Sequence, residues 1–336
     1  MNMNLFLRNV SSFIIFWIGP VFLILLIGYI YYDPFKVVRK YASYSQPQIT
    51  SSRDYISTEF FLNNYKKYGY NSFVFGSSRS NVFKAKPWLQ YIGQDEKPYF
   101  CDASQETIYG IYIKLRLLEK LHVKIKNCII LLCRDVSFAN DQNDKGHIFI
   151  KHPEASLESY TTFQLEFFKS YLNPKFLHAF YAFQILKQYK PYMSEYFIGR
   201  TITYDSVTNE LNILGLDEAI QKDPIAYYKD ESLKFYERKG ETTDSVSRIN
   251  PEMEFMIHEI KRILTANRTR YKIILSPLYE QIKFHDQDLK ILQSNFGKEV
   301  YDFTGKNKFT EEKINFYEKS HFRKHIADSL LAIIYK

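Results

Sequence analysis

The chain has 336 residues, a length typical of two average domains or of one large α/β domain with an insertion. It contains only 12 glycines and 11 prolines, and 46% of its residues are hydrophobic, which excludes collagen-like, low-complexity and wholly disordered classes. The formal net charge of +8 is compatible with an anionic membrane surface, and no nucleic-acid-binding motif accompanies it. We therefore expect no nucleic-acid partner.

An uncharged segment near the N-terminus predicts a membrane-spanning helix. Residues 13–32 are almost wholly apolar, and about 20 apolar residues span a bilayer core. Trp17 and the tyrosines at its far end are typical of anchors at the membrane–water interface. We expect a short tail at 1–12, a single span at 13–32 and a linker with a helix at 33–70. A cleaved signal peptide is the alternative, although bulky residues rather than a small-residue cleavage site follow the run.

The charges that flank this helix favour a cytoplasmic location for the rest of the chain. Arg8 precedes the helix, whereas Lys36, Arg39 and Lys40 follow it. Positively charged flanks tend to stay on the cytoplasmic side, so this count weakly predicts a domain inside the cell.

Beyond residue 70, short apolar runs alternate with helical patterns. The predicted strands lie at 72–75, 98–101, 127–133, 271–275 and 300–303. Helical spacing of apolar residues follows at 108–118, after Asn250-Pro251, and at 326–334 near the C-terminus. This alternation predicts an α/β domain over 71–336, with a mostly parallel sheet covered by helices on both faces. Any site is then expected at the carboxyl ends of the strands.

Residues 139–247 break this rhythm. They are rich in Tyr, Phe and Lys and show no clear buried strand, so we interpret them as a helical insertion. Its aromatic residues fill either a small core of their own or a wall that faces a substrate. The three cysteines are too few for a disulfide framework and form no C-x-x-C pair, so we expect them to be buried and free.

The first candidate site follows the first predicted strand, in the segment Phe73–Ser80. The strand leads through Gly76 and Ser77 to Ser78 at the expected start of a helix. A hydroxyl at that position lies beside free backbone N–H groups, which an acyl-transfer nucleophile needs for its oxyanion. A phosphate cradle over Gly76–Ser80 and a simply capped helix are the alternatives.

The second candidate lies just before the C-terminal helix, where Glu318 precedes His321 by three residues. A carboxylate at that spacing can orient the imidazole, which then accepts a serine proton. Glu318 as a solvated charge and His321 as a helix cap are the alternatives. His325 follows His321 at the spacing of a metal pair on a helix, but no third ligand is in view. We therefore expect neither a metal nor an organic cofactor.

Taken together, the two segments resemble the SGNH (GDSL-type) hydrolase superfamily, and within it the membrane-anchored bacterial branch with a Gly-Ser-Ser-Arg signature. That branch includes D-alanyl-transfer and alginate O-acetylation proteins. The resemblance covers roughly 70–138 and 250–336, leaving the anchor and the insertion outside it. It implies a flavodoxin-like parallel sheet, with Ser78 as nucleophile, His321 as general base and acid, and Glu318 as the orienting carboxylate.

The resemblance is weaker at the oxyanion hole. Ser77 replaces the usual Asp, Glu318 is one methylene longer than the usual carboxylate, and the expected Gly and Asn are not plainly present. We then expect the oxyanion or the substrate to be contacted by four other residues: Arg79, Ser77, Asp102 and Ser104. Asn140 lies nearby in sequence but matches no family pattern.

The resemblance implies a membrane-tethered serine esterase or O-acyltransferase that modifies, and most often acetylates, a cell-envelope polysaccharide. It implies a membrane-bound acyl donor protein as partner and a domain outside the cytoplasmic membrane, against the flanking charges. The alternative is a non-catalytic SGNH-like scaffold or glycan-binding component of a polysaccharide assembly or export complex. A phosphate site at Gly76–Ser80, with no role for His321, is a third hypothesis.

Overall fold

The computed structural model describes residues 3–45, 48–139, 146–198 and 202–336. The chain forms two compact units. The first contains residues 1–42, 48–51 and 159–199, and the second contains residues 43–47, 52–158 and 200–336. The segment 139–247, expected as one insertion, is therefore divided between the two units.

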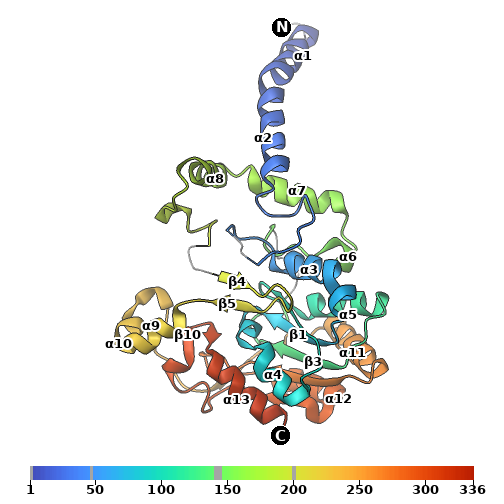
Figure 1. Ribbon diagram of the computed structural model, residues 1–336, viewed down its shortest axis with the longest axis vertical. Helices are drawn as coiled ribbons and strands as arrows, with labels where there is room; N and C mark the ends of the chain where they lie inside the picture. The colour runs from blue at the N-terminus through green and yellow to red at the C-terminus, as the bar shows by residue number, and fades with distance from the viewer. Residues whose placement is uncertain (1–2, 46–47, 140–145, 199–201) are drawn as a thin grey trace. The chain divides into compact units, whose positions relative to one another are not determined.

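The first unit begins with one long helical segment (Figure 1). It consists of α1 (Met3–Phe13), a π-helical turn (Ile14–Ile18) and α2 (Gly19–Tyr32), and its apolar part covers 27 residues, Phe6–Tyr32. The helix therefore starts well before residue 13, inside the expected tail. Pro20 lacks the N–H that would continue the regular ladder, and the π-helical turn lies directly before it. This helix is long and apolar enough to cross a membrane, a property that anchors and signal sequences share.

Two aromatic-rich helices complete the first unit. They are α7 (Tyr160–Tyr171) and α8 (Pro174–Leu186), followed by the 3-10 turn η4 (Pro191–Met193). Ser159 and Asn173 cap them by accepting hydrogen bonds from backbone N–H groups. The helical character expected for this part of the insertion is confirmed.

The second unit is built on a five-stranded, fully parallel sheet in the order β2-β1-β3-β7-β9. Its strands are β1 (Ser72–Ser77), β2 (Pro98–Ala103), β3 (Asn127–Leu132), β7 (Arg270–Leu275) and β9 (Val300–Asp302). This is a doubly wound order in which the chain reverses direction beside β1. The expectation of an α/β fold with a parallel sheet is confirmed, and all five strands fall where the apolar runs predicted them.

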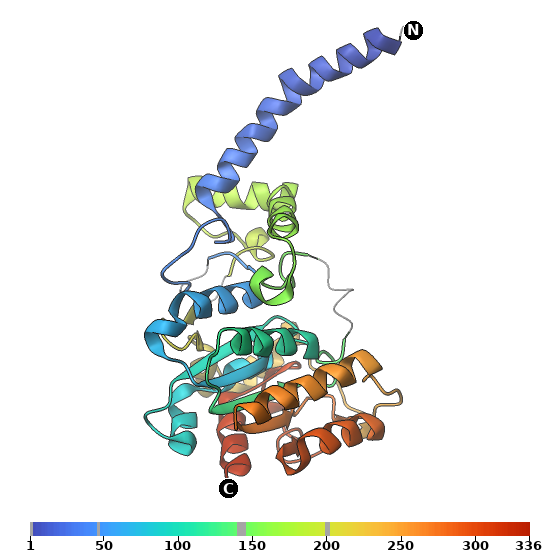
Figure 2. The ribbon, with the colours of Figure 1, turned by 90° about the vertical axis from the view of Figure 1, so that its right-hand side faces the viewer.

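Helices cover both faces of this sheet, as Figure 2 shows. On one face, α4 (Ala85–Ile92) and α13 (Lys324–Ile334) pack on side chains such as Val74, Ile129 and Ile274. On the other lie α3 (Arg53–Tyr68), α5 (Ile108–Lys120) and α11 (Pro251–Ala266), with α12 (Asp286–Phe296) beside α11. Asn250 caps α11, as its position before Pro251 predicted.

Short elements complete the second unit. The helical ones are η2 (Ser78–Val82), α6 (Pro153–Ser156), α9 (Leu216–Lys222), α10 (Pro224–Lys229), η5 (Glu231–Leu233), η6 (Gly297–Glu299) and η7 (Lys313–Asn315). The paired strands are β4 (Ile202–Tyr204) with β5 (Leu211–Ile213), β6 (Thr242–Thr243) with β8 (Ile282–Lys283), and β10 (Phe316–Glu318) with β11 (His321–Phe322). The three cysteines are buried and free, as expected.

Candidate active site

Ser78 lies where the chain leaves the central strand. β1 ends at Ser77, and Ser78 is the first residue of the short 3-10 helix η2. Ser77 is the N-cap: its buried hydroxyl accepts the Arg79 N–H at 3.4 Å and lies 3.6 Å from the Cys133 sulfur. Ser78 is thus placed at the carboxyl edge of the sheet, next to the point where the strand order reverses.

His321 and Glu318 lie in a tight antiparallel hairpin. The two residues are directly opposite each other in β10 and β11, with only Lys319 and Ser320 between them. Opposed residues of a hairpin have neighbouring side chains, which brings the carboxylate to the imidazole locally. The Ser320 N–H also donates to Glu318 Oε2 at 2.8 Å, which holds the carboxylate in place.

The three predicted residues form one hydrogen-bonded line. Ser78 Oγ lies 2.8 Å from His321 Nε2, although 243 positions separate them in the chain. The Nδ1 atom of His321 is hydrogen-bonded to Glu318 Oε1. A carboxylate only accepts, so Nδ1 carries the proton and Nε2 is free to accept from the Ser78 hydroxyl.

Glu318 is held in its charged form. Burial works to raise the pKa of its carboxyl, but the hydrogen bond and charge of His321, together with the Ser320 N–H and Arg79, outweigh burial and lower that pKa below its ordinary value. An ionised carboxylate at this position stabilises the imidazolium that forms when His321 takes a proton.

Arg79 joins the two halves of this arrangement. Its two terminal nitrogens donate to Asp135 at 2.6 and 2.7 Å, and its Nε donates to the Ser320 carbonyl at 2.7 Å. Arg79 therefore links η2 to the exit of β3 and to the turn of the His321 hairpin. Bound in this way, the Arg79 side chain positions Ser78 and His321, and its expected oxyanion contact stays a prediction.

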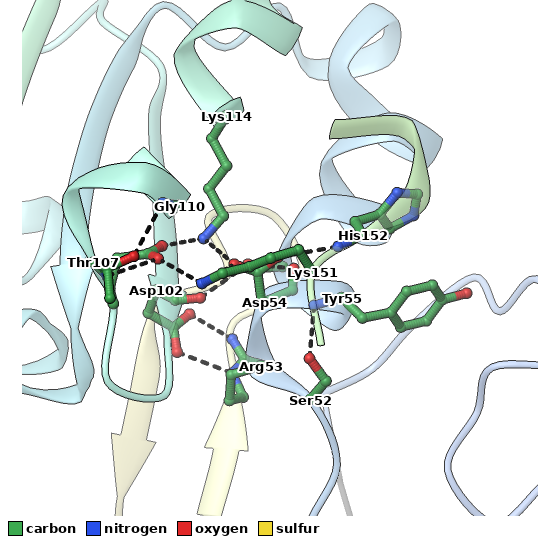
Figure 3. Close-up of polar contacts among 12 residues, drawn as sticks. Ser52, Arg53, Asp54, Tyr55, Asp102, Thr107, Gly110, Lys114, Lys151 and His152 are labelled. Atoms are coloured by element: carbon green, nitrogen blue, oxygen red, sulfur yellow. Dashed lines mark hydrogen bonds and ion pairs between the residues drawn. The ribbon is translucent and has the colours of Figure 1, made fainter. Parts of the chain in front are cut away.

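Asp102 and Ser104, the other two oxyanion candidates, are not brought to the Ser78 pocket. Asp102, one residue before the end of β2, is a buried partner of Arg53, with contacts of 2.9 and 2.6 Å (Figure 3). It also accepts a hydrogen bond from the Asn209 side-chain amide. Ser104 follows the same strand, and neither residue lines the pocket. Burial between fixed partners gives Asp102 a structural role. Asn140 lies outside the described residues.

A pocket of about 500 Å³ opens beside the Ser78–His321 pair and is lined by both residues and by Glu318. One wall is apolar and comes from β5 and the turn after it, with Leu211, Ile213 and Leu214. Polar groups stand elsewhere on the lining: Asn81, Lys84, Asn212, Asp217 and Lys324. Mixed apolar walls with a few polar groups are typical of small-molecule sites, whose volumes run from roughly 300 to 1,000 Å³.

Asn81 lines the pocket but was not among the site residues predicted from the sequence. It follows Ser78 by three positions in η2, and in a 3-10 helix such residues lie on the same face. Its side-chain amide therefore reaches the same pocket as the Ser78 hydroxyl. The spacing Ser-x-x-Asn could have suggested this, because residues three apart share a face of a 3-10 or an α-helical turn.

The segment 217–235, also outside the resemblance, holds the His321 hairpin. Tyr227 and Tyr228 donate to the carbonyls of Tyr317 and Phe316 at 2.9 and 2.7 Å. Asp217 accepts from Arg323 at 2.8 Å and from the Tyr317 hydroxyl. This part of the expected insertion therefore supports the site as well as lining its pocket.

His325 is hydrogen-bonded to a neighbouring side chain. Its Nε2 lies 3.1 Å from the Asn315 side-chain oxygen. Among the described residues, no group of three His, Cys, Asp or Glu side chains is gathered so that it could hold a metal ion. Comparison with known proteins adds no assignment: no family model and no curated protein matches the chain.

Proposed function

We propose that this chain is a membrane-tethered serine esterase or O-acyltransferase of the SGNH type. The observation that carries the proposal is the hydrogen-bonded line Ser78–His321–Glu318 at the carboxyl edge of a parallel sheet, beside a pocket. Nucleophile, base and orienting carboxylate in this order are the parts that acyl transfer requires.

In the proposed reaction, Ser78 Oγ attacks an ester carbonyl and His321 Nε2 accepts the hydroxyl proton. Collapse of the tetrahedral intermediate breaks the ester C–O bond, and His321 returns the proton to the leaving alcohol. A sugar hydroxyl or a water molecule then attacks the acyl-Ser78 ester, with His321 again as base. The Asn81 amide supports the negatively charged oxygen of the intermediate, because it lies on the face of η2 that carries Ser78.

For the substrate we propose a cell-envelope polysaccharide, with acetyl as the transferred acyl group. The donor is a membrane-bound acyl-transfer protein, and residues 13–32 tether the chain to the cytoplasmic membrane with the sheet-containing unit outside. The support is the resemblance of Gly76–Arg79 and of Glu318–His321, together with an apolar helix long enough to span a bilayer.

A fluorophosphonate probe tests the enzymatic part of the proposal on the full-length protein. We expect labelling of the wild type, no labelling of Ser78→Ala, and unchanged labelling of Ser294→Ala, a matched serine on the surface of α12. If the wild type does not react under conditions that label a control esterase, the alternative of a non-catalytic glycan-binding scaffold takes its place. Phosphate binding that is insensitive to His321→Ala would favour the phosphate-site hypothesis instead.

A further inference from the structure

The second aromatic-rich region of the chain, helices α7 and α8, packs directly on the apolar helix α2. Phe168 of α7 has its ring 5.6 Å from that of Phe22 and 5.3 Å from that of Tyr29. Tyr171 and Gln164 also reach Tyr29, through a ring contact at 5.4 Å and a hydrogen bond of 3.1 Å. The contact therefore covers the last three turns of the apolar segment.

Close approach of α8 to the same part of α2 depends on a glycine. A Cβ added at Gly28 would lie 2.5 Å from the Tyr181 hydroxyl and 2.8 Å from that of Tyr171. The two hydroxyls satisfy each other with a hydrogen bond of 2.6 Å, as polar groups in apolar surroundings must. Tyr32 adds ring contacts to Phe180 and Tyr181.

These contacts place α7 and α8 at a defined depth. Phe22 and Tyr29 are seven residues apart, about 10 Å along a helix, so Phe168 lies between them on the lipid-side stretch of α2. Tyr29, Tyr31 and Tyr32 are of the type that occupies the membrane–water interface. Phe168 therefore lies roughly one to two turns deeper than that aromatic belt, a depth of about 5–10 Å that interfacial helices reach.

Large apolar side chains on these two helices are mostly exposed. Leu165 is 59% exposed and shares a face of α7 with Phe168, three positions on. Ile185 is 79% exposed and shares a face of α8 with Tyr181, four positions before it. The faces that contact α2 are thus the faces that carry exposed apolar residues. Figures 1 and 2 show both helices lying crosswise to α2, the direction of a helix in the membrane plane.

Charge in the first unit suits an anionic lipid surface. Its sequence carries eight Lys or Arg residues against three Asp or Glu residues. Lys169 is 78% exposed at its side chain and follows Leu165 by four positions on the same helix face. A lysine there can lay its stem on apolar surface and put its ammonium group among lipid phosphates.

We propose that α7 and α8 form a membrane-interface platform, with Leu165 and Ile185 immersed in the headgroup–acyl boundary and the lysines at anionic headgroups. The proposal rests on the membrane anchor of the proposed function but is independent of the chemistry at Ser78. The platform would hold the end of α2 against lipid at fixed depth. A protein partner on the same faces is the competing outcome of the test.

The test uses the full-length protein in nanodiscs of phosphatidylcholine and phosphatidylglycerol. The three native cysteines are buried, so an environment-sensitive thiol dye reports single variants Leu165→Cys and Ile185→Cys. Leu23→Cys, within the span, is the lipid-exposed control, and Ile225→Cys, an exposed apolar residue of α10, is the aqueous control. The unsubstituted protein gives the background.

We expect loss of dye fluorescence at 165 and 185 with lipids that carry a quencher near the headgroup, and less loss with a quencher deep in the acyl chain. The dye at 225 should respond to aqueous iodide only. If either platform position behaves like 225, the platform is overturned. If position 23 also escapes lipid quenching, the anchor itself fails, whereas reaction of Ser78 with a fluorophosphonate is unaffected by either result.

Discussion

Glu318 carries one methylene more than the aspartate that the resemblance would place before His321, and the hairpin explains how it fits. Its two oxygens reach His321 Nδ1 and the Ser320 N–H, so the longer side chain still meets two donors. We expect Glu318→Gln to reduce acyl-transfer kcat by about 10³–10⁴-fold, because the neutral amide cannot stabilise the imidazolium. Glu318→Asp should lose less, since the charge remains. Steady-state ester hydrolysis measures both, and Lys319→Gln in the same turn is the control; equal rates for Gln and Glu at 318 would contradict the assigned role.

Asn81 is the residue proposed to support the oxyanion. If its amide holds the oxyanion, Asn81→Ala lowers kcat by about 10²–10³-fold and leaves KM nearly unchanged, because the contact is made in the transition state. Asn212→Ala, on the same pocket, is the matched control and should act mainly on KM. A loss confined to KM in the Asn81 variant would assign this residue to substrate binding instead.

The ion pair of Asp135 with Arg79 at the candidate site should make the stability of the fold depend on pH. Burial works to raise the pKa of this carboxyl, but the hydrogen bonds and the charge of Arg79 outweigh burial and lower that pKa below its ordinary value. A third of the Asp135 side chain is exposed, so solvent screens the pair and reduces its contribution to stability. A carboxyl with a depressed pKa stabilises the fold above its unfolded pKa of about 3.9 and loses that contribution as the pH falls through its folded value.

We therefore expect Asp135→Asn to lower the free energy of unfolding by roughly 1–2 kcal/mol at pH 5 to 7, with the difference from wild type shrinking below about pH 4. Urea unfolding at several pH values measures this difference. Asp95→Asn, in an exposed turn, should stay within about 0.5 kcal/mol of wild type. A difference that stays constant down to pH 3 would show that the Arg79 pair does not depend on the ionisation of Asp135.

At the scale of elements, a buried charge cluster joins α3, α5 and the segment before α6 (Figure 3). Lys114 of α5 lies 2.7 Å from Asp54 and is paired with Glu106, while Lys151 lies 3.1 Å from Glu106 and 3.5 Å from Asp54. Two carboxylates and two ammonium groups compensate one another there. Burial works to lower the pKa of Lys114, but the two carboxylates outweigh it and raise that pKa. Lys114 therefore keeps its charge at neutral pH.

Removing one member leaves an uncompensated buried charge. We expect Lys114→Met to lower the free energy of unfolding by about 3–5 kcal/mol, because two carboxylates then share one lysine. Lys120→Met, on the exposed side of the same helix, is the matched control and should change it by less than about 0.5 kcal/mol. Thermal and urea unfolding measure the stability of the two variants. If Lys114→Met is as stable as Lys120→Met, the cluster relaxes or takes up water when the lysine is lost.

The strands and the His321 hairpin could be predicted from the sequence, whereas contacts between distant segments could not. The five strands could be predicted because each is a short apolar run, and a strand buried on both faces leaves that mark. Glu318 and His321 could be paired because their contact is local. The partners of Arg79 and Asp102 could not be predicted, since Asp135 and Arg53 are 56 and 49 positions away and no periodicity links them. For the same reason two of the expected oxyanion residues proved to be ion-pair partners.

At the scale of the whole molecule, the division of residues 139–247 has a physical basis. The stretch 159–199 has aromatic residues at helical spacing and finds its apolar partner in α2. The stretch 202–247 has short strands and turns whose tyrosines and acids bind the His321 hairpin. Composition made the two stretches look alike, because Tyr and Phe pack against α2 in one and support the candidate site in the other.

The cations that follow the apolar helix bear on the orientation of the whole chain. Arg39 donates to the Tyr31 carbonyl at 3.0 Å, so it satisfies the end of α2. Asp33 accepts from the backbone N–H groups of Val37, Val38 and Arg39 and so places a negative charge in the same turn. A cation held at a helix end, as Arg39 is, has a structural role on either side of a membrane, which weakens its part in the prediction from the flanking charges.

On the resemblance to the envelope-modifying branch, we expect the sheet-containing unit outside the cytoplasmic membrane. Alkaline phosphatase fused to the C-terminus should be active in cells, because this enzyme folds only where its disulfides form. A green fluorescent protein fusion at the same point, which reports a cytoplasmic end, should be dark. Arg39→Gln and Lys40→Gln, which remove flanking charge, should leave the orientation unchanged. An inactive phosphatase with a bright fluorescent fusion would place the unit in the cytoplasm, where Ser78 and His321 could still react with a fluorophosphonate but no envelope polysaccharide would be within reach.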